Sequence, residues 1–155
     1  MKPLGPHDLH VVVDGRTNKE KVFDCKGTLL KEFDVFPHGA NGPSQEVTGG
    51  DTVAELYLLG APQWTRDDED LETVRRPYGW VFLPMQDYEG QEAAFGRSGI
   101  GSHGGGHIAD FWEPRQELTF THGCVRHHNE DVKWLALQVE ATHKLGGQVW
   151  MTVLQ

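Results

Sequence analysis

The chain has 155 residues, 37% of them hydrophobic, and a formal net charge of −9 at pH 7. This length suits one domain with its own core, so we expect residues 1–155 to form a single domain. The acidic balance argues against a nucleic-acid partner, because phosphate contacts need clustered lysine and arginine. It also argues against adhesion to an anionic membrane surface. No apolar run approaches the roughly 18 residues of a membrane-spanning helix, so we expect no membrane insertion. The sequence does not indicate an oligomeric state.

The first third of the chain has the composition of β-strands. Residues 9–14, 21–25 and 28–36 are rich in β-branched and aromatic side chains, and turn residues separate them. We expect a β-meander in which each strand pairs with the next along the chain. A loop with several glycines and prolines follows over residues 37–50.

The middle of the chain predicts two further strands, over residues 52–58 and 78–84. Between them, residues 63–77 are strongly charged, and we expect this segment to be a solvated excursion on the surface.

The last third changes to the period of a helix. Apolar residues recur at i, i+3, i+4 and i+7, which places them on one helix face: Val132, Leu135, Ala136 and Val139. Asn129 is the expected N-cap, and Gly146-Gly147 the expected end. A final strand is expected over 148–154. The predicted fold is therefore mainly β, as a β-sandwich or mixed sheets, with one clear helix.

Two cysteines, Cys25 and Cys124, are too few for a disulfide framework. Cys25 is expected to be a small, partly buried residue at a hairpin end. Cys124 lies in the segment Thr-His-Gly-Cys-Val-Arg over 121–126, and His103 precedes it in a glycine-rich run. A cysteine attacks a carbonyl as thiolate and needs a nearby base or positive field. The pattern therefore indicates a nucleophile with its base.

These two segments resemble the signature of the L,D-transpeptidase (YkuD-type) catalytic domain family. That signature is a histidine, a spacer, and then Ser/Thr-His-Gly-Cys, a hydrophobic residue and Asn or Arg. The spacer here, residues 104–120, has 17 residues and falls within the family's range. The meander over 11–36 and the helix after Asn129 also look like the family's, whereas residues 50–60 match it only in part. The resemblance implies a YkuD-like fold over the whole chain.

The resemblance also implies a role for each motif residue. Cys124 would be the nucleophile and His103 its general base, with the backbone carbonyl of Gly104 orienting the imidazole. The backbone N–H groups of His122, Gly123 and Cys124 would form an oxyanion hole.

The implied reaction is acyl transfer on peptidoglycan stem peptides. The thiolate would attack the carbonyl of the diamino acid at stem position three and expel the terminal D-residue. An amine from a neighbouring stem would then give a 3→3 cross-link, whereas water would make the protein an L,D-carboxypeptidase. Arg126 would bind a substrate carboxylate through its planar pair of donors. The resemblance implies no cofactor and no metal.

Zinc chemistry is one alternative to this interpretation. His103 and His107 are four residues apart, and three further histidines surround Cys124 in the next stretch; such side chains are good zinc ligands. A zinc-dependent peptidoglycan peptidase would use them. The glycines between His103 and His107 argue against this reading, because they disfavour the helix that would place both on one face.

A second alternative is a non-catalytic module that keeps the fold, either a wall-binding domain or a virion-associated structural subunit. We expect the protein to act at the cell wall or in the periplasm, yet the N-terminal residues contain no apolar signal segment. A phage-encoded protein, or one released by lysis, would fit both observations. Aromatic residues in the connection over 105–118 could form a lid, although we favour packing of that loop onto the domain.

Overall fold

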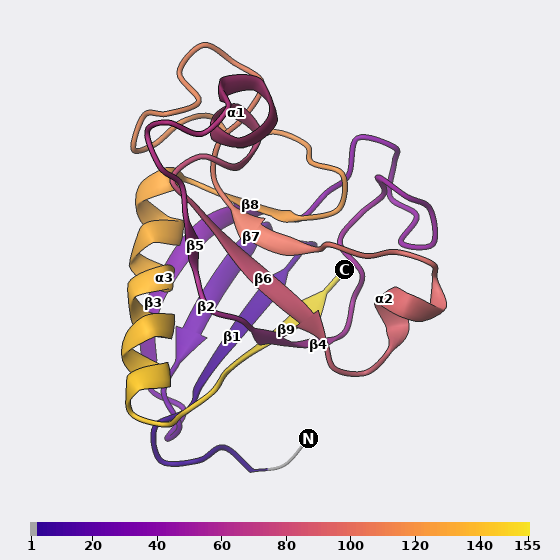
Figure 1. The fold of residues 1–155 in the computed structure, drawn as a ribbon. Coiled ribbons are helices and arrows are strands. Elements are labelled where there is room, and N and C mark those ends of the chain that lie inside the picture. Colours follow the sequence, from indigo (N-terminus) through magenta and orange to yellow (C-terminus); the bar gives the residue numbers. More distant parts are fainter. Residues whose placement is uncertain (1–2) are drawn as a thin grey trace.

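The computed structural model describes residues 3–155 (Figure 1). Its elements, in chain order, are β1 (Leu9–Asp14), β2 (Lys19–Phe23), β3 (Leu29–Phe36), β4 (Leu56–Leu59), β5 (Gln63–Trp64), the π-helix η1 (Leu71–Arg75), α1 (Arg76–Tyr78), β6 (Val81–Asp87), α2 (Gln91–Ala94), β7 (Gly101–His103), β8 (Val125–His127), α3 (Asn129–Lys144) and β9 (Val149–Leu154).

The strands form one mixed sheet that closes on itself. Their order is β4-β9-β1-β2-β3-β8-β7-β6, and a further pairing of β4 with β6 completes the ring, while β5 pairs with the first two residues of β6. The pairs β1–β9 and β7–β8 are parallel and the other strand pairs are antiparallel. The predicted mainly β fold with mixed pairing is confirmed, and the closure of the sheet is an addition to it.

The meander of the first third is confirmed. β1 pairs with β2 and β2 with β3, both antiparallel. The alternation predicted for β9 is also confirmed, since Val149, Met151 and Val153 are buried. β9 pairs with β1 on one side and with β4 on the other, so the last strand of the chain has a neighbour at both edges.

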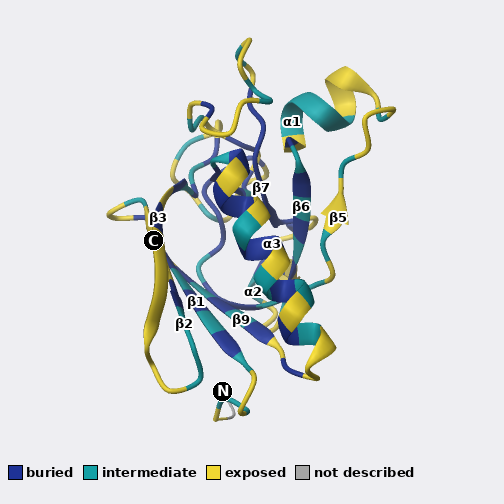
Figure 2. Ribbon diagram, turned by 90° about the vertical axis from the view of Figure 1, so that its left-hand side faces the viewer, coloured by how far each residue is buried: buried dark blue, intermediate teal, exposed yellow. Residues whose placement is uncertain are grey.

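The helix α3 packs along the sheet with its predicted apolar face inward. In Figure 2 buried and exposed residues alternate along its ribbon, as expected of a helix with one buried face. The four predicted face residues are fully buried: Val132, Leu135, Ala136 and Val139. Burying an aliphatic side chain of this kind contributes roughly 1.5–3 kcal/mol, which explains why this short amphipathic pattern forms a stable helix.

The predicted N-cap of α3 was wrong. His128 occupies the cap position, and Asn129 is the first helical residue. The Asn129 side chain makes tertiary contacts instead: its Oδ1 accepts the N–H of Gly105 at 3.1 Å, and its Nδ2 donates to the carbonyls of Phe111 and Glu113, both at 2.8 Å. These bonds attach the connection over 105–118 to the start of the helix, which agrees with the expected packing of that loop.

The predicted strands of the middle third are displaced along the chain. β4 begins only at Leu56, because residues before it hydrogen-bond to loops: the N–H of Thr52 donates to the carbonyl of Pro37, and that of Ala54 to Oε1 of Gln45. β6 starts at Val81 and runs to Asp87. The charged excursion is largely exposed and holds β5, η1 and α1. Among residues 3–155, no helix has both the length and the hydrophobicity needed to cross a bilayer.

Candidate active site

The two motif segments meet because β7 and β8 are parallel neighbours. His103 is the last residue of β7 and pairs with Arg126 of β8, while Cys124 immediately precedes β8. Cys124, His103, His122 and Arg126 all line one pocket of about 250 Å³, which we call the thiol pocket. The connection between β7 and β8 lies with α1 at one end of the molecule (Figure 1).

Hydrogen bonds fix the turn that carries Cys124. The hydroxyls of Thr121 and Thr52 both donate to the carbonyl of Cys124, at 2.8 and 3.2 Å. Gly123 has φ +119°, in the left-handed half of backbone space that favours glycine. This backbone conformation explains why the motif has glycine at position 123.

The thiol of Cys124 lies against the chain segment that leads into β7. Its Sγ is 3.8 Å from the carbonyl oxygen of Gly99. Burial raises the pKa of the Cys124 thiol to about 11, although the N–H of Gly101 and the charges of Arg126 and Arg97 act in the opposite direction. The thiol is therefore protonated at neutral pH in this resting arrangement, even though the residue is partly exposed to the pocket.

His103 is buried and held by backbone and aromatic contacts. Its Nδ1 lies 2.8 Å from the carbonyl oxygen of Gly104. Since a carbonyl only accepts, Nδ1 carries the proton and Nε2 keeps a lone pair. Tyr78 packs edge-on against the imidazole and Phe82 stacks on it, with ring centroids at 5.0 and 5.9 Å. Burial lowers the pKa of His103 to about 3, with the charge of Arg126 acting in the same direction, so the ring is neutral. Nothing among residues 3–155 hydrogen-bonds this ring to the thiol of Cys124.

Arg126 is buried, and backbone carbonyls occupy most of its donors. Its Nη1 donates to Pro77 and Gly104, its Nη2 to Phe120 and its Nε to Thr119, over distances of 2.6 to 3.3 Å. Four of the five guanidinium N–H groups are thus used, which leaves one for a ligand in the pocket. Binding of a substrate carboxylate by Arg126 stays a prediction, and this arrangement limits it to a single hydrogen bond.

The three backbone N–H groups predicted for an oxyanion hole are not equivalent. The N–H of Gly123 donates to the hydroxyl of Thr121 at 3.0 Å. Within the described chain, no hydrogen bond uses the N–H of His122 or Cys124. These two groups are available to a substrate oxygen, whereas Gly123 would first have to release its partner.

Several residues around the site were not singled out from the sequence. Arg97 is buried and lies beside the Cys124 turn, where its Nη2 donates to the carbonyl of His122. Tyr78 and Phe82 enclose the imidazole, and Thr52 supports the nucleophile from a distant segment. None of them belongs to the motif. Buried arginines are unusual, so the structure marks Arg97 as a residue of interest. Its burial cannot be predicted from one sequence.

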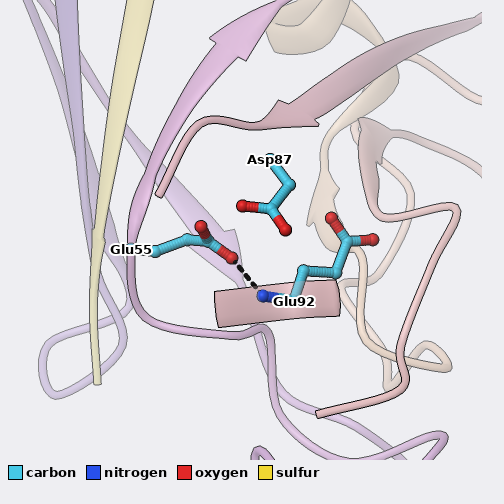
Figure 3. A group of neighbouring side chains, drawn as sticks. All are labelled: Glu55, Asp87 and Glu92. Atoms are coloured by element: carbon cyan, nitrogen blue, oxygen red, sulfur yellow. Dashed lines mark hydrogen bonds between the residues drawn. The ribbon is translucent and has the colours of Figure 1, made fainter. Parts of the chain in front are cut away.

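A second polar centre lies behind the wall of the thiol pocket. It consists of Glu55, Asp87 and Glu92, whose oxygens lie within 4.8 Å of one another, and we call it the carboxylate cluster (Figure 3). Backbone N–H groups of Glu92 and Ala93 donate to Glu55 and Asp87 at 2.7 and 3.0 Å. Burial raises the pKa of Glu55 to about 7, and its hydrogen bond with Asp87 acts in the same direction. At neutral pH Glu55 therefore holds a proton part of the time.

The carboxylate cluster bears on the zinc alternative. Among residues 3–155, it is the one group of three or more His, Cys, Asp or Glu side chains close enough together to bind a metal ion. Its oxygen donors suit hard cations such as Ca²⁺ rather than zinc. The residues named for the zinc alternative do not form such a group, so the geometry does not support a zinc site there; they are His103, His107, His122, Cys124, His127 and His128.

Comparison with known proteins identifies the class of this domain. The family model of the L,D-transpeptidase catalytic domain, YkuD, matches residues 57–150. The match covers more than half of the chain and includes both motif segments. The chain therefore belongs to the YkuD family of L,D-transpeptidase catalytic domains, a family that acts on the peptidoglycan of the cell wall. No curated protein matches the sequence.

Solved structures support the same fold at low sequence identity. Bd1075 from Bdellovibrio bacteriovorus is similar over 97% of this chain and 48% of its own, with 18% identity and a TM-score of 0.67. The helical cell shape determining protein Pgp2 from Campylobacter jejuni is similar over 94% and 46%, with 15% identity and a TM-score of 0.60. An L,D-transpeptidase from Stackebrandtia nassauensis is similar over 95% and 55%, with 14% identity and a TM-score of 0.54. The chain thus spans about half the length of these structures.

Proposed function

We propose that this domain catalyses cysteine-dependent acyl transfer on peptidoglycan stem peptides, as an L,D-transpeptidase or, with water as acceptor, as an L,D-carboxypeptidase. The observation that carries the proposal is the meeting of Cys124 and His103 in one pocket of a YkuD-family fold. The site of action would then be the cell wall.

In the proposed mechanism, Cys124 is the nucleophile and His103 the general base. Because both groups are neutral at rest, the thiol proton would pass to Nε2 of His103 as Sγ bonds to the carbonyl carbon of the third stem residue. The proton would then go to the departing amine of the terminal D-residue, which leaves a thioester. Attack on the thioester by an amine or by water would release Cys124.

The surrounding groups would position and stabilise this reaction. The carbonyl of Gly104 holds Nδ1 of His103 and keeps Nε2 free to accept the proton. The N–H groups of His122 and Cys124 would receive the oxyanion, and Gly123 would contribute once its bond to Thr121 opens. Arg126 would offer its remaining N–H to a substrate carboxylate.

The test is incubation of the purified domain with stem tetrapeptides, followed by mass spectrometry. We expect loss of the terminal D-residue, or formation of a 3→3 dimer, and acylation of Cys124 by a carbapenem. Cys124→Ala should abolish all three, and Cys25→Ala is the matched control that should keep them. Turnover by Cys124→Ala equal to that of the unaltered protein would refute Cys124 as the nucleophile. No turnover and no acylation by the unaltered protein would favour the non-catalytic module.

A further inference from the structure

Arg97 lies outside the motif, in the connection from α2 to β7, and is only 6% exposed. Its Nη1 donates to the carbonyls of Gln45 and Asp51 at 2.9 and 2.5 Å, and its Nη2 to those of Gly50 and His122 at 3.1 and 3.4 Å. A buried guanidinium is costly unless its donors are satisfied, and these carbonyls satisfy four of its five N–H groups. Arg97 therefore joins its own connection to the loop over 45–51 and to the nucleophile turn.

The guanidinium also lies directly against the residue before the nucleophile. A Cβ atom placed on Gly123 would be 1.9 Å from Nη2 of Arg97, closer than any real contact. The segment that follows Arg97 forms the wall facing the sulfur, through the carbonyl of Gly99 and the N–H of Gly101. One side chain thus holds both the turn that carries Cys124 and the backbone that faces it.

Arg97 forms no ion pair with a carboxylate among residues 3–155, although the charge of Glu92 acts both on Arg97 and, in the direction that raises the thiol pKa, on Cys124. Among residues 3–155, its hydrogen bonds go to carbonyl oxygens and it takes part in no salt bridge. In a partly buried site such a charge stabilises a nearby anion more strongly than it would in water. The charge of Arg97 accordingly acts to lower the pKa of the Cys124 thiol, whereas burial raises it.

We propose that Arg97 is a positioning residue for acyl transfer, which holds the Gly123-Cys124 turn against the 99–101 wall and favours the thiolate of Cys124 through its fixed charge. The inference rests on the proposed function only in taking Cys124 as the nucleophile.

Two variants separate the charge from the hydrogen bonds. Arg97→Met removes both at similar length, whereas Arg97→Lys keeps the charge but loses the planar pair of donors. The first measurement is the rate of iodoacetamide labelling at Cys124 across pH 6–10, read by peptide mass spectrometry. The second is the rate of carbapenem acylation at the same residue. Arg66→Met, a change to an exposed arginine on the charged excursion, is the matched control.

We expect Arg97→Met to slow labelling of Cys124 about tenfold at pH 8, equivalent to one unit of thiol pKa. Arg97→Lys should label within about twofold of the unaltered protein, yet acylate about tenfold more slowly, because the turn is held less firmly. Arg66→Met should change neither rate. A purely structural Arg97 would lower the melting temperature of both variants without moving the pH profile.

A labelling profile of Arg97→Met that superimposes on that of the unaltered protein would overturn the inference. If Arg97→Met does not fold, Arg97→Lys decides, and acylation at the unaltered rate would then count against positioning. Failure of the proposed function would look different. The unaltered protein would then neither acylate nor turn over tetrapeptide, while the shift in labelling at Cys124 could still be measured.

Discussion

The thiol pocket and the carboxylate cluster are two buried polar centres of opposite charge on either side of one short segment. Ile100 lies between them: its N–H donates to Glu92 at 3.4 Å, while its neighbours Gly99 and Gly101 face the thiol of Cys124. Backbone carbonyls satisfy the buried arginines on one side, and backbone N–H groups satisfy the carboxylates on the other. Between these two centres the buried charges are separated by polypeptide backbone and do not form ion pairs, and the positive side is the one that contains the nucleophile.

Replacement of His103 should give the largest loss of reactivity at Cys124, because it removes the proposed base from the thiol pocket. His103→Gln retains an N–H that can donate to Gly104 but has no basic nitrogen. We expect the acylation rate of Cys124 by a carbapenem to fall by roughly 10²–10⁴-fold. His143→Gln, on the far end of α3, is the control and should acylate normally. A His103→Gln variant with full activity would mean that the base lies elsewhere.

The pH dependence of thiol reactivity tests the balance between burial and positive charge at Cys124. Because burial raises the pKa of Cys124 to about 11, about one thiol in ten thousand is ionised at pH 7. Alkylation requires the thiolate, so its rate at Cys124 should rise about tenfold per pH unit between pH 7 and 9 and still be rising at pH 10. Iodoacetamide labelling measures this, with free glutathione as reference. A plateau below pH 8 would show that the positive charges near Cys124 lower the pKa of its thiol by more than burial raises it.

The carboxylate cluster should give the smallest effect, on stability rather than on chemistry. Burial raises the pKa of Glu92, and the charge of Asp87 acts in the same direction. A carboxyl whose pKa is raised by folding binds its proton more tightly in the folded state, so stability falls as pH rises above the unfolded value of 4.5. Glu92→Gln removes this charge. We expect it to raise the melting temperature by about 2–4 °C at pH 8, and by less at pH 5.

Thermal unfolding of Glu92→Gln at both pH values tests this expectation. Glu117→Gln makes the same chemical change on an exposed side chain and should leave both melting temperatures unaltered. A destabilised Glu92→Gln at pH 8 would contradict this expectation. It would indicate that the charge of Glu92 stabilises the fold, through the bond from Ile100 and the attraction to Arg97, by more than its burial costs.

The sequence predicted the parts of the molecule that depend on short-range pattern. Alternation gave the meander and β9, helical spacing gave the buried face of α3, and the two motif segments predicted that His103 and Cys124 belong together. Their assigned roles remain proposals. The three-residue strands β7 and β8 contain too few residues for any alternation to be visible, although they bring the motif segments into contact.

The features that the sequence did not predict depend on contacts between distant segments. Asn129 fits the preference for an N-cap, but three hydrogen bonds from its side chain to the 105–118 connection decide its place. Arg97 and the carboxylate cluster have the composition of surface residues, and only the folded chain surrounds them with backbone donors and acceptors. The bond from the N–H of Gly123 to Thr121 likewise depends on the exact shape of a turn.

The position of β9 has a consequence for how this domain is made. β9 pairs with β1 on one side and with β4 on the other, so residues 149–154 join strands that begin at residues 9 and 56. The sheet therefore cannot close until residue 154 has left the ribosome. Contacts of such long sequence separation also slow folding, because the chain must be brought together before it gains any pairing. Until β9 is available, β1 and β4 each lack one strand partner, and unpaired strand edges favour pairing with other chains.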